Sequence, residues 1–205
     1  MKTVMVKVGG SLLTLPDLPD RLEAMIDNIR ADRVMLLVGG GQAADVVRSW
    51  DETHRLDTEA SHWLAIDAMG LTTRLMTKLL PDAELVSDRA SAHQTNVPAK
   101  TVILDPGPVI EEASFEAAKT LPSGWDCTSD AIAGWLASRW KVASLVLAKS
   151  IDIPMPDASS TQPGSGVDPV FQSVISDSIP VYWCNVRTDP EATALWKHAS
   201  ARSSL

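Results

Sequence analysis

The first fifteen residues, MKTVMVKVGGSLLTL (1–15), place a lysine and two glycines directly after an apolar run. The run TVMVKV is typical of a buried strand, with Lys7 near its end. Gly9, Gly10 and Ser11 follow at once. By itself this stretch favours two interpretations equally: an anion bound at the strand end, or a lysine that ends a strand before a glycine turn. The rest of the sequence has to decide between them.

Short apolar runs alternate with segments of helical periodicity along the chain. The runs predict strands at residues 3–8, 33–38, 83–86, 100–105, 143–148 and 179–186. The periodic segments predict helices at residues 18–31, 42–54, 58–80, 111–119, 128–140 and 190–201. This alternation is typical of an α/β fold, so we expect a three-layer αβα sandwich with a mainly parallel sheet. Because no repeat or long linker interrupts the pattern, we expect residues 1–205 to form a single domain.

The composition excludes several classes of protein. The chain has 205 residues and a net charge of −8, without the basic stripe that nucleic-acid-binding proteins carry. No segment approaches the roughly 18 consecutive apolar residues that suggest a membrane span. Cys127 and Cys184 lack metal-ligand spacing, which indicates reduced thiols. We therefore expect a cytoplasmic protein that binds neither nucleic acid nor membrane.

Three predicted strands end in residues that suit an anion. These ends carry Lys7, Gly9, Gly10 and Ser11, then Gly39, Gly40 and Gly41, then Lys149, Ser150 and Asp152. In a parallel sheet the carboxyl ends of the strands share one edge, where ligands bind. Glycines let backbone N–H groups approach phosphate oxygens, and the helix predicted after the three glycines adds a positive N-terminus. Two lysines could then flank a phosphoryl group during transfer, a reaction that needs positioning and charge neutralisation.

Other familiar site motifs are missing from the sequence. It contains no G-x-x-x-x-G-K-[ST] loop and no G-x-S-x-G turn, and VGGGQAADV (38–46) lacks the spacing of a dinucleotide-binding G-x-G-x-x-G. The four histidines form no metal-spaced pair, so we predict no metal site built from protein side chains. Most of them are interpreted as structural. His62 is the least ordinary, since it lies beside Trp63 near the start of the long predicted helix.

Four segments, in this order, resemble the amino acid kinase superfamily, which includes acetylglutamate, carbamate, uridylate and isopentenyl phosphate kinases. They are KVGGSLL (7–13), LLVGGGQAADVVR (36–48), SDAIAGWLA (129–137) and LVLAKSID (145–152). The resemblance implies the α/β fold described above and ATP with Mg²⁺ as the phosphoryl donor. It also implies a small-molecule acceptor, and a homo-oligomer formed through the helices after the three glycines.

The resemblance further implies a role for each strand end. Lys7, Asp130 and Lys149 would be catalytic, with Asp130 orienting the lysines by charge-assisted hydrogen bonds. The implied nucleotide-binding residues are Gly9, Gly10, Ser11, Lys149, Ser150 and Asp152, and the implied acceptor-binding residues include Gly39, Gly40 and Gly41. The alternative for Asp130 is an ordinary acid at a helix N-terminus. We expect Lys7 to face a solvated cleft and Asp130 to lie at a surface helix end, so that replacing either barely affects stability.

A narrower resemblance is to the small, archaeal-type branch that includes the aminomethylfuran phosphate kinase of methanofuran biosynthesis, an enzyme linked to one-carbon metabolism. It rests on ASHWLAIDAMG (60–70), GWDCTSDAIAGWLA (124–137), LVLAKSID (145–152) and GVDPVF (166–171). It implies an acceptor pocket lined by Trp125, Asp126, Thr128 and Ser129. There an aromatic side chain would stack on a furan ring and Asp126 would pair with an amine. Trp125 is equally well interpreted as a core anchor.

The chain departs from the family pattern at two places. The usual T-D-V-D-G is replaced by KSIDI (149–153), and the later G-G-M-x-x-K segment with its second lysine is absent. Either Lys149 substitutes for that lysine or ATP turnover is weakened. The alternative function is therefore a non-catalytic nucleotide- or oxyanion-binding protein of the same fold, as in molybdate or tungstate storage. The loop at residues 151–168 is expected to cover a ligand.

Overall fold

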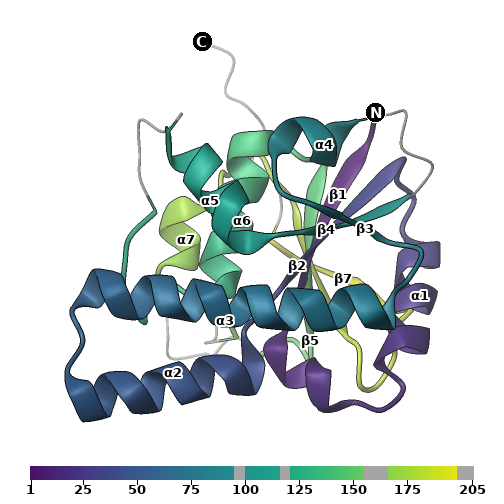
Figure 1. Ribbon diagram of the computed structural model, residues 1–205. Coiled ribbons are helices and arrows are strands. Elements are labelled where there is room, and N and C mark those ends of the chain that lie inside the picture. Colours follow the sequence, from purple (N-terminus) through teal and green to yellow (C-terminus); the bar gives the residue numbers. More distant parts are fainter. Residues whose placement is uncertain (95–99, 116–120, 155–165, 198–205) are drawn as a thin grey trace, which may run out of the picture.

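The computed structural model describes residues 1–94, 100–115, 121–154 and 166–197. Within these residues a seven-stranded sheet has the order β3-β4-β2-β1-β5-β6-β7 (Figure 1). Its strands are β1 (Thr3–Val8), β2 (Arg33–Val38), β3 (Glu84–Val86), β4 (Thr101–Leu104), β5 (Ser144–Lys149), β6 (Val181–Asn185) and β7 (Ala194–Lys197). Neighbouring strands are parallel, except that β6 and β7 are antiparallel. The expected α/β fold with a mainly parallel sheet is confirmed.

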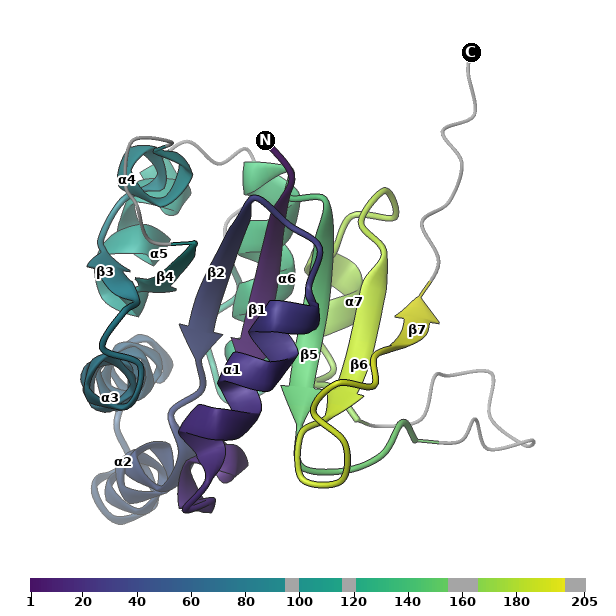
Figure 2. The same ribbon diagram turned by 90° about the vertical axis from the view of Figure 1, so that its right-hand side faces the viewer.

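Helices cover both faces of this sheet. They are the 3-10 helix η1 (Gly10–Thr14) and the α-helices α1 (Leu18–Asn28), α2 (Gly41–His54), α3 (Thr58–Leu79), α4 (Arg89–His93), α5 (Pro106–Phe115), α6 (Ser129–Trp140) and α7 (Phe171–Val174). Figure 2 shows α1 on the near face of the sheet and α6 and α7 on the far face. The sheet is therefore the middle of the three expected layers.

The pleat of the strands decides which layer each side chain reaches. In β1, Met5 belongs to the hydrophobic cluster that contains α6, whereas Val4 belongs to the cluster that contains α1. Lys7 lies two residues after Met5, so it points toward α6. In β5, Leu147 belongs to the α6 cluster, and the same spacing directs Lys149 to that face. Both strand-end lysines thus lie on the α6 side of the sheet.

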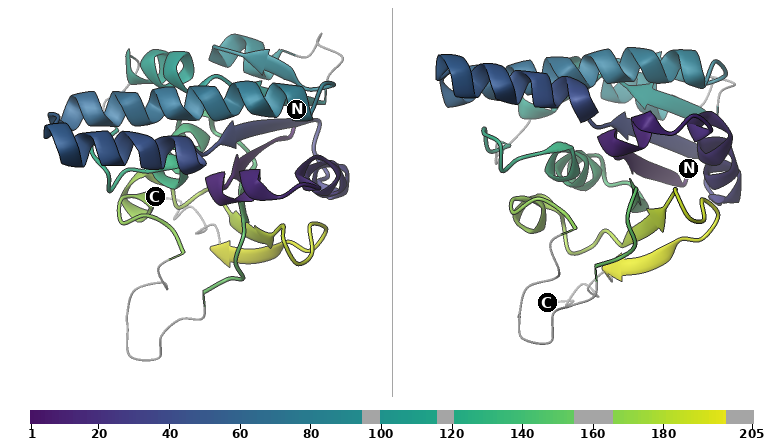
Figure 3. Two further views of the ribbon diagram at one scale, coloured as in Figure 1. Left: turned by 60° about the horizontal axis from the view of Figure 1, so that its bottom comes forward. Right: turned by 90° about the horizontal axis from the view of Figure 1, so that it is seen from below.

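The two helices after β2 form an antiparallel pair that lies side by side (Figure 3). Asp57 caps α3 by accepting hydrogen bonds from the N–H groups of Glu59 and Ala60. Ile66 and Met69 of α3 belong to the α6 cluster. Because α2 begins at Gly41, the last of the three glycines that follow β2, this pair starts at the carboxyl edge of the sheet. No helix in the described part of the chain is long and apolar enough to cross a membrane.

The prediction of a helix at residues 190–201 is wrong. Ala194–Lys197 instead forms β7, which pairs with β6 at the sheet edge, and the last residues of that segment lie outside the described part. Trp196 of β7 packs against Phe171 and Trp183, with ring centroids 5.7 and 6.2 Å apart. The open edge of β6 and these aromatic contacts outweigh the helical spacing of the sequence.

Two other expectations need adjustment. The small helix expected at residues 111–119 begins earlier, at Pro106, and its last residues lie outside the described ranges. Proline suits the first turn of a helix because its missing N–H has no partner there. Of the loop expected at residues 151–168, residues 155–165 lie outside the described part, so its role as a cover stays a prediction.

Candidate active site

The carboxyl ends of β1, β2 and β5 meet at one edge, because these strands are adjacent and parallel. The N–H of Gly9 donates to a β5 carbonyl at 2.8 Å, and the N–H of Gly39 donates to the last carbonyl of β1 at 2.9 Å. The Oγ atoms of Ser11 and Ser150 are hydrogen-bonded at 2.9 Å. The three strand ends singled out by the sequence therefore lie together.

The two glycine-rich segments pack directly against one another. A Cβ atom on Gly10 would overlap the backbone nitrogen of Gly41, and one on Gly41 would lie 2.8 Å from the carbonyl oxygen of Gly10. Gly41 also has a φ of +52°, a left-handed conformation that glycine adopts readily. A Cβ on Gly39 would lie 2.8 Å from the Oγ of Ser129. Backbone packing therefore requires glycine at these positions, whatever ligand they bind.

Gly10→Ala should lower the free energy of unfolding by about 1–3 kcal/mol, because the added methyl group overlaps backbone atoms of the other segment. For a chain of this size, each kcal/mol lowers Tm by about 2–4 °C, which calorimetry measures. Gly70→Ala is the matched control, since Gly70 lies inside α3 and a Cβ there meets nothing within 4 Å. It should raise stability by about 0.5–1 kcal/mol, the helix preference of alanine over glycine. Equal effects of the two changes would contradict tight packing between the glycine segments.

Beneath this edge, Lys7, Asp130 and Lys149 form a buried cluster that we call the lysine–aspartate triad. Oδ1 of Asp130 lies 3.0 Å from Nζ of Lys7, and Oδ2 accepts a hydrogen bond from Nζ of Lys149 at 2.5 Å. The side chains of Lys7 and Asp130 are each 6% exposed, and that of Lys149 is 12% exposed. The structure thus brings the three predicted catalytic residues into contact.

The charges of the triad depend on one another. Burial by itself would raise the pKa of Asp130, but the ammonium groups of Lys7 and Lys149 outweigh it and hold that pKa below its ordinary value. Burial, followed by the charge of Lys7, lowers the pKa of Lys149 to about 8, a net value that already includes the opposing effect of Asp130. Lys149 therefore loses its proton at a much lower pH than an exposed lysine.

Two expectations about exposure are wrong. Lys7 does not face a solvated cleft and Asp130 is not a surface residue, since both are buried. In the sequence Lys7 lies near the end of a strand before two glycines, but the pleat places it under the first turn of α6. Asp130 itself lies in that turn and faces the sheet. Replacing Asp130 is therefore expected to affect stability as well as chemistry.

The remaining predicted nucleotide-binding groups lie around the end of β5. Nζ of Lys149 donates a second hydrogen bond, at 2.9 Å, to the carbonyl of Gly166, and lies 5.3 Å from the ring centroid of Trp183. Oδ1 of Asp152 accepts a hydrogen bond from Asn185 at 2.7 Å. These groups occupy the positions that the strand pattern predicts, and their binding of a nucleotide stays a prediction.

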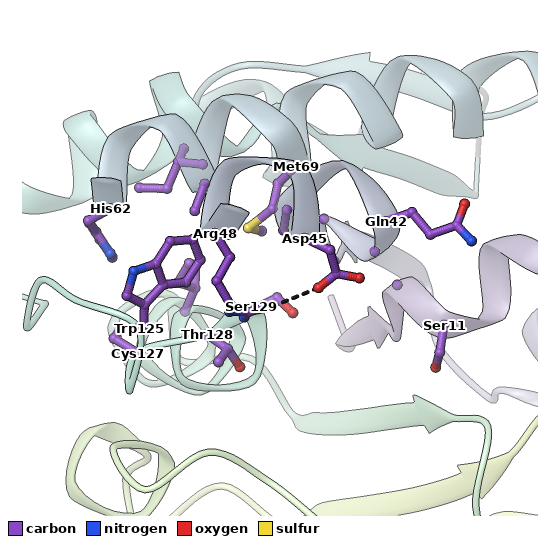
Figure 4. Close-up of a pocket in the computed structure, with 18 of the residues that line it drawn as sticks. Ser11, Gln42, Asp45, Arg48, His62, Met69, Trp125, Cys127, Thr128 and Ser129 are labelled. Atoms are coloured by element: carbon purple, nitrogen blue, oxygen red, sulfur yellow. Dashed lines mark hydrogen bonds and ion pairs between the residues drawn. The ribbon is translucent and has the colours of Figure 1, made fainter. Parts of the chain in front are cut away.

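A cavity of about 510 Å³ lies between the glycine segments, the helix pair α2–α3 and the start of α6 (Figure 4). Its lining includes six of the seven residues predicted to bind the acceptor, which are Gly39, Gly40, Gly41, Trp125, Thr128 and Ser129. Ile66, Met69 and Ile132 give it an apolar wall. The seventh residue, Asp126, is exposed and does not line the cavity, so its predicted place in the acceptor pocket is wrong. Its two neighbours, Trp125 and Cys127, line the cavity in its place.

Side chains of α2 fix the orientation of Trp125. Its Nε1 donates a hydrogen bond to Asp51 at 2.6 Å, and the guanidinium carbon of Arg48 lies 4.7 Å from its ring centroid. Arg48 in turn donates to Asp45 at 2.7 Å, the contact drawn as a dashed line in Figure 4. Among the described residues, neither hydrophobic cluster includes Trp125. The structure therefore favours Trp125 as a wall of the cavity over its interpretation as a core anchor.

His62 lies at the end of the cavity beside Trp125 (Figure 4). Its Nδ1 accepts a hydrogen bond from the N–H of Gly124 at 3.4 Å, and burial lowers its pKa. The ring is therefore neutral at pH 7, with its proton on Nε2, where it can donate to a ligand. The sequence marked His62 only as unusual, and it gave no sign of Arg48.

Arg187 also reaches the cavity lining, from the turn after β6. It donates hydrogen bonds to the carbonyl of Ser11 and to Oγ1 of Thr14, both at 3.2 Å. Arg187 directly follows the strand predicted at residues 179–186, so a sequence search for Lys and Arg at the end of every predicted strand would have found this residue. Within the described part of the chain, no group of three or more His, Cys, Asp and Glu side chains could hold a metal ion.

Comparisons with known proteins agree with this fold. The family profile described as the amino acid kinase family matches residues 2–153. The uridylate kinase of Archaeoglobus fulgidus is similar in structure, with a TM-score of 0.61, 20% identity and 93% of each chain covered. The UMP kinase of Bacillus anthracis has a TM-score of 0.60 and 12% identity, with 95% of this chain and 98% of that chain covered. No curated protein matches the sequence significantly.

Proposed function

Because the chain belongs to the amino acid kinase family, we propose that it transfers a phosphoryl group from ATP to a small acceptor that carries a phosphate or carboxylate. The observation that carries this proposal is the lysine–aspartate triad at the carboxyl edge of the sheet. Phosphoryl transfer needs little covalent help from a protein; it needs fixed positive charge and alignment. Two ammonium groups held by one buried carboxylate supply both.

Each part of the site has a role in this reaction. ATP would lie across the ends of β1 and β5, over Gly9, Ser11 and Ser150. Mg²⁺ would enter the site already bound to the phosphates of ATP. Both oxygens of Asp130 are engaged by lysines, so this carboxylate orients ammonium groups instead of holding the ion. The acceptor lies in the cavity with its anionic end toward the glycines and the N-terminus of α2. The protein contributes alignment and charge.

For the acceptor we propose an aminomethylfuran phosphate or a compound of similar size and chemistry. The fixed indole of Trp125 and the apolar wall at Met69 suit a small flat ring. Since Asp126 does not line the cavity, we assign recognition of an amine to Asp45, which does. The neutral His62 adds a hydrogen-bond donor at the far end.

The non-catalytic alternative has one observation in its favour. Lys149 already donates to Asp130 and to the carbonyl of Gly166, which leaves its ammonium group one further donor for a phosphate. A protein that only binds a nucleotide or an oxyanion would use the same edge of the sheet without moving these contacts. A measurement of phosphoryl transfer distinguishes the two functions, because only the kinase turns over ATP.

A thermal-shift screen with ATP, GTP and UTP, each with Mg²⁺, tests the proposal first. A nucleotide at about 100 times its Kd adds about 2.7 kcal/mol to the stability of the protein, a readily measured shift. The best nucleotide is then assayed for transfer to small phosphate monoesters, including an aminomethylfuran phosphate. Stabilisation by ATP with transfer supports the kinase. Stabilisation by ATP without transfer to any acceptor supports the binding protein and contradicts the kinase.

The rate of transfer should fall as the pH rises through about 8. The pKa of Lys149 is lowered to about 8, chiefly by burial, so its ammonium form is lost above that pH. An ordinary lysine keeps its proton to about pH 10. The pH dependence of kcat/KM measures this titration. Lys149→Arg keeps a cation at every accessible pH and should remove the alkaline decline, even at a lower rate. An unchanged decline in Lys149→Arg would exclude Lys149 as its cause.

We also propose that the protein is a homo-oligomer joined through α2 and α3. Both helices expose apolar side chains four residues apart, Val46 and Trp50 on α2 and Leu71 and Leu75 on α3. Trp50→Glu should shift the protein toward the monomer in sedimentation velocity. Phe115→Glu changes another exposed apolar residue, on α5, and should leave the mass unchanged. A wild-type protein that sediments as a monomer would contradict this interface.

We also propose a location and a domain organisation for the protein. Cys127 and Cys184 are free and buried, which suits the reducing cytoplasm, where ATP is also available. We propose a cytoplasmic enzyme on this basis. One continuous sheet runs through the described residues from β1 to β7, which supports a single domain over residues 1–205.

A further inference from the structure

Asp168 is a buried carboxylate that neither the motifs nor the proposed reaction explains. Its residue is 9% exposed and lies just before α7, far from α6 in the sequence. Oδ2 accepts hydrogen bonds from the N–H of Thr128 at 3.0 Å, from Oγ1 of Thr128 at 2.7 Å and from the N–H of Ala131 at 2.9 Å. Oδ1 accepts one from the N–H of Phe171 at 2.8 Å. One carboxylate thus caps α6 from outside that helix and also the start of α7.

These contacts lead directly to the triad. Oγ1 of Thr128, which donates to Asp168, accepts a hydrogen bond from the N–H of Asp130 at 3.3 Å. Asp168 therefore fixes the residues on both sides of Asp130 in the first turn of α6. Because Asp130 must face Lys7 and Lys149 together, a small rotation of this turn would break one of its two ion pairs.

The segment that carries Asp168 also holds the other side of the triad. Gly166, two residues earlier, accepts the second hydrogen bond of Lys149 through its carbonyl. A Cβ on Gly166 would overlap the Trp183 ring and lie 2.6 Å from a side-chain carbon of Pro154, so this carbonyl has little freedom to move. The same short segment therefore touches Lys149 at one end and the first turn of α6 at the other.

We propose that Asp168 is a positioning residue for phosphoryl transfer, which holds the first turn of α6 so that Asp130 faces Lys7 and Lys149 at once. This inference rests on the proposed function for its catalytic consequence. The charge of Asp168 also acts on Lys149: together with Asp130 it raises the pKa of this lysine, against the larger lowering by burial and by Lys7. The carboxylate of Asp168 occupies the N-terminus of α6 and acts on Asp130 through Thr128, so the acceptor's anion binds elsewhere.

Two variants of the full-length protein separate the charge of Asp168 from its hydrogen bonds. Asp168→Asn removes the charge and keeps one oxygen, which can still accept from the N–H groups of Thr128 and Ala131, since asparagine caps helices about as well as aspartate; it gives up the bond from the N–H of Phe171. Asp168→Ala removes both. Asp88→Asn is the control: Asp88 caps α4 by accepting from Ser91 and takes no part in the triad.

Two of the measurements need no acceptor. The titration of Lys149 is followed by NMR of lysines labelled at Cε, and the exchange of the Thr128 and Ala131 amides by hydrogen–deuterium exchange. In Asp168→Asn the Lys149 titration should move to lower pH with little change in exchange. In Asp168→Ala both should change, and kcat should fall about tenfold to a hundredfold with KM for ATP little affected, since misplacing a reacting group by about 1 Å can cost about a hundredfold. Asp88→Asn should change neither measurement.

The outcomes distinguish three situations. Faster amide exchange in Asp168→Ala with an unchanged Lys149 titration in both variants would make Asp168 a structural cap only, and would overturn the proposal. Unchanged amide exchange in Asp168→Ala would overturn it as well. If both measurements change as expected while the wild type transfers phosphate to no acceptor, the positioning of the triad is supported and the proposed kinase activity fails.

Discussion

Replacing Lys7 with methionine should lower kcat by about 10²–10³ while the protein stays folded. Removing one preorganised donor to charge that develops in a transition state typically costs about 2.7–4 kcal/mol. The loss falls mainly on kcat because the ammonium group of Lys7 interacts most strongly with the phosphoryl group during transfer. Methionine keeps the apolar stem in its buried place. Asp130 retains Lys149 as its partner, so no buried charge is left unpaired.

Steady-state kinetics and denaturant unfolding of the same preparations test this result. Lys2→Met is the matched control, because Lys2 is exposed and precedes the opposite end of β1. The pKa of Lys149 should rise in Lys7→Met, since the charge of Lys7 lowers it in the wild type. A loss of nucleotide affinity without any measurable turnover in either protein would support the non-catalytic alternative. A kcat equal to that of Lys2→Met would exclude Lys7 from the reaction.

Asp130→Asn should lower the free energy of unfolding by about 3–5 kcal/mol at neutral pH, because removing one partner of a buried ion pair leaves uncompensated charge. Here two ammonium groups would face each other without a carboxylate. The sign of the pH dependence follows from Lys149. Its pKa, already lowered to about 8, falls further in the variant, so the proton is lost more easily as the pH rises. The stability deficit should therefore shrink between neutral and alkaline pH.

Denaturant unfolding of Asp130→Asn at several pH values measures this deficit. Asp126→Asn is the control, because Asp126 lies four residues earlier and is exposed. Its effect should stay within about 0.5 kcal/mol, as for most surface substitutions. If Asp130→Asn were no less stable than Asp126→Asn, the triad would not be a coupled buried cluster.

The sequence alone determined the strands β1 to β6, their order of appearance and the edge at which the chemistry lies. Buried parallel strands such as β1 and β5 are apolar runs of the kind that periodicity detects. Since the carboxyl ends of parallel strands share one edge, the pattern around Lys7, Gly39 and Lys149 was enough to bring these residues together. The position of Asp130 beside the lysines came from the family resemblance.

Only the tertiary structure decided what these residues contact and how deeply they are buried. The burial of Lys7 depends on the pleat of β1 and on α6, a helix more than a hundred residues later in the chain. No local sequence pattern predicts that these two segments pack together. The edge strand β7 replaced a predicted helix because pairing with β6 and the packing of Trp196 outweigh helical spacing. The capping of α6 by Asp168 spans 37 residues between Ala131 and Asp168. Local propensities act over a few residues, whereas these contacts depend on how distant segments fold against one another.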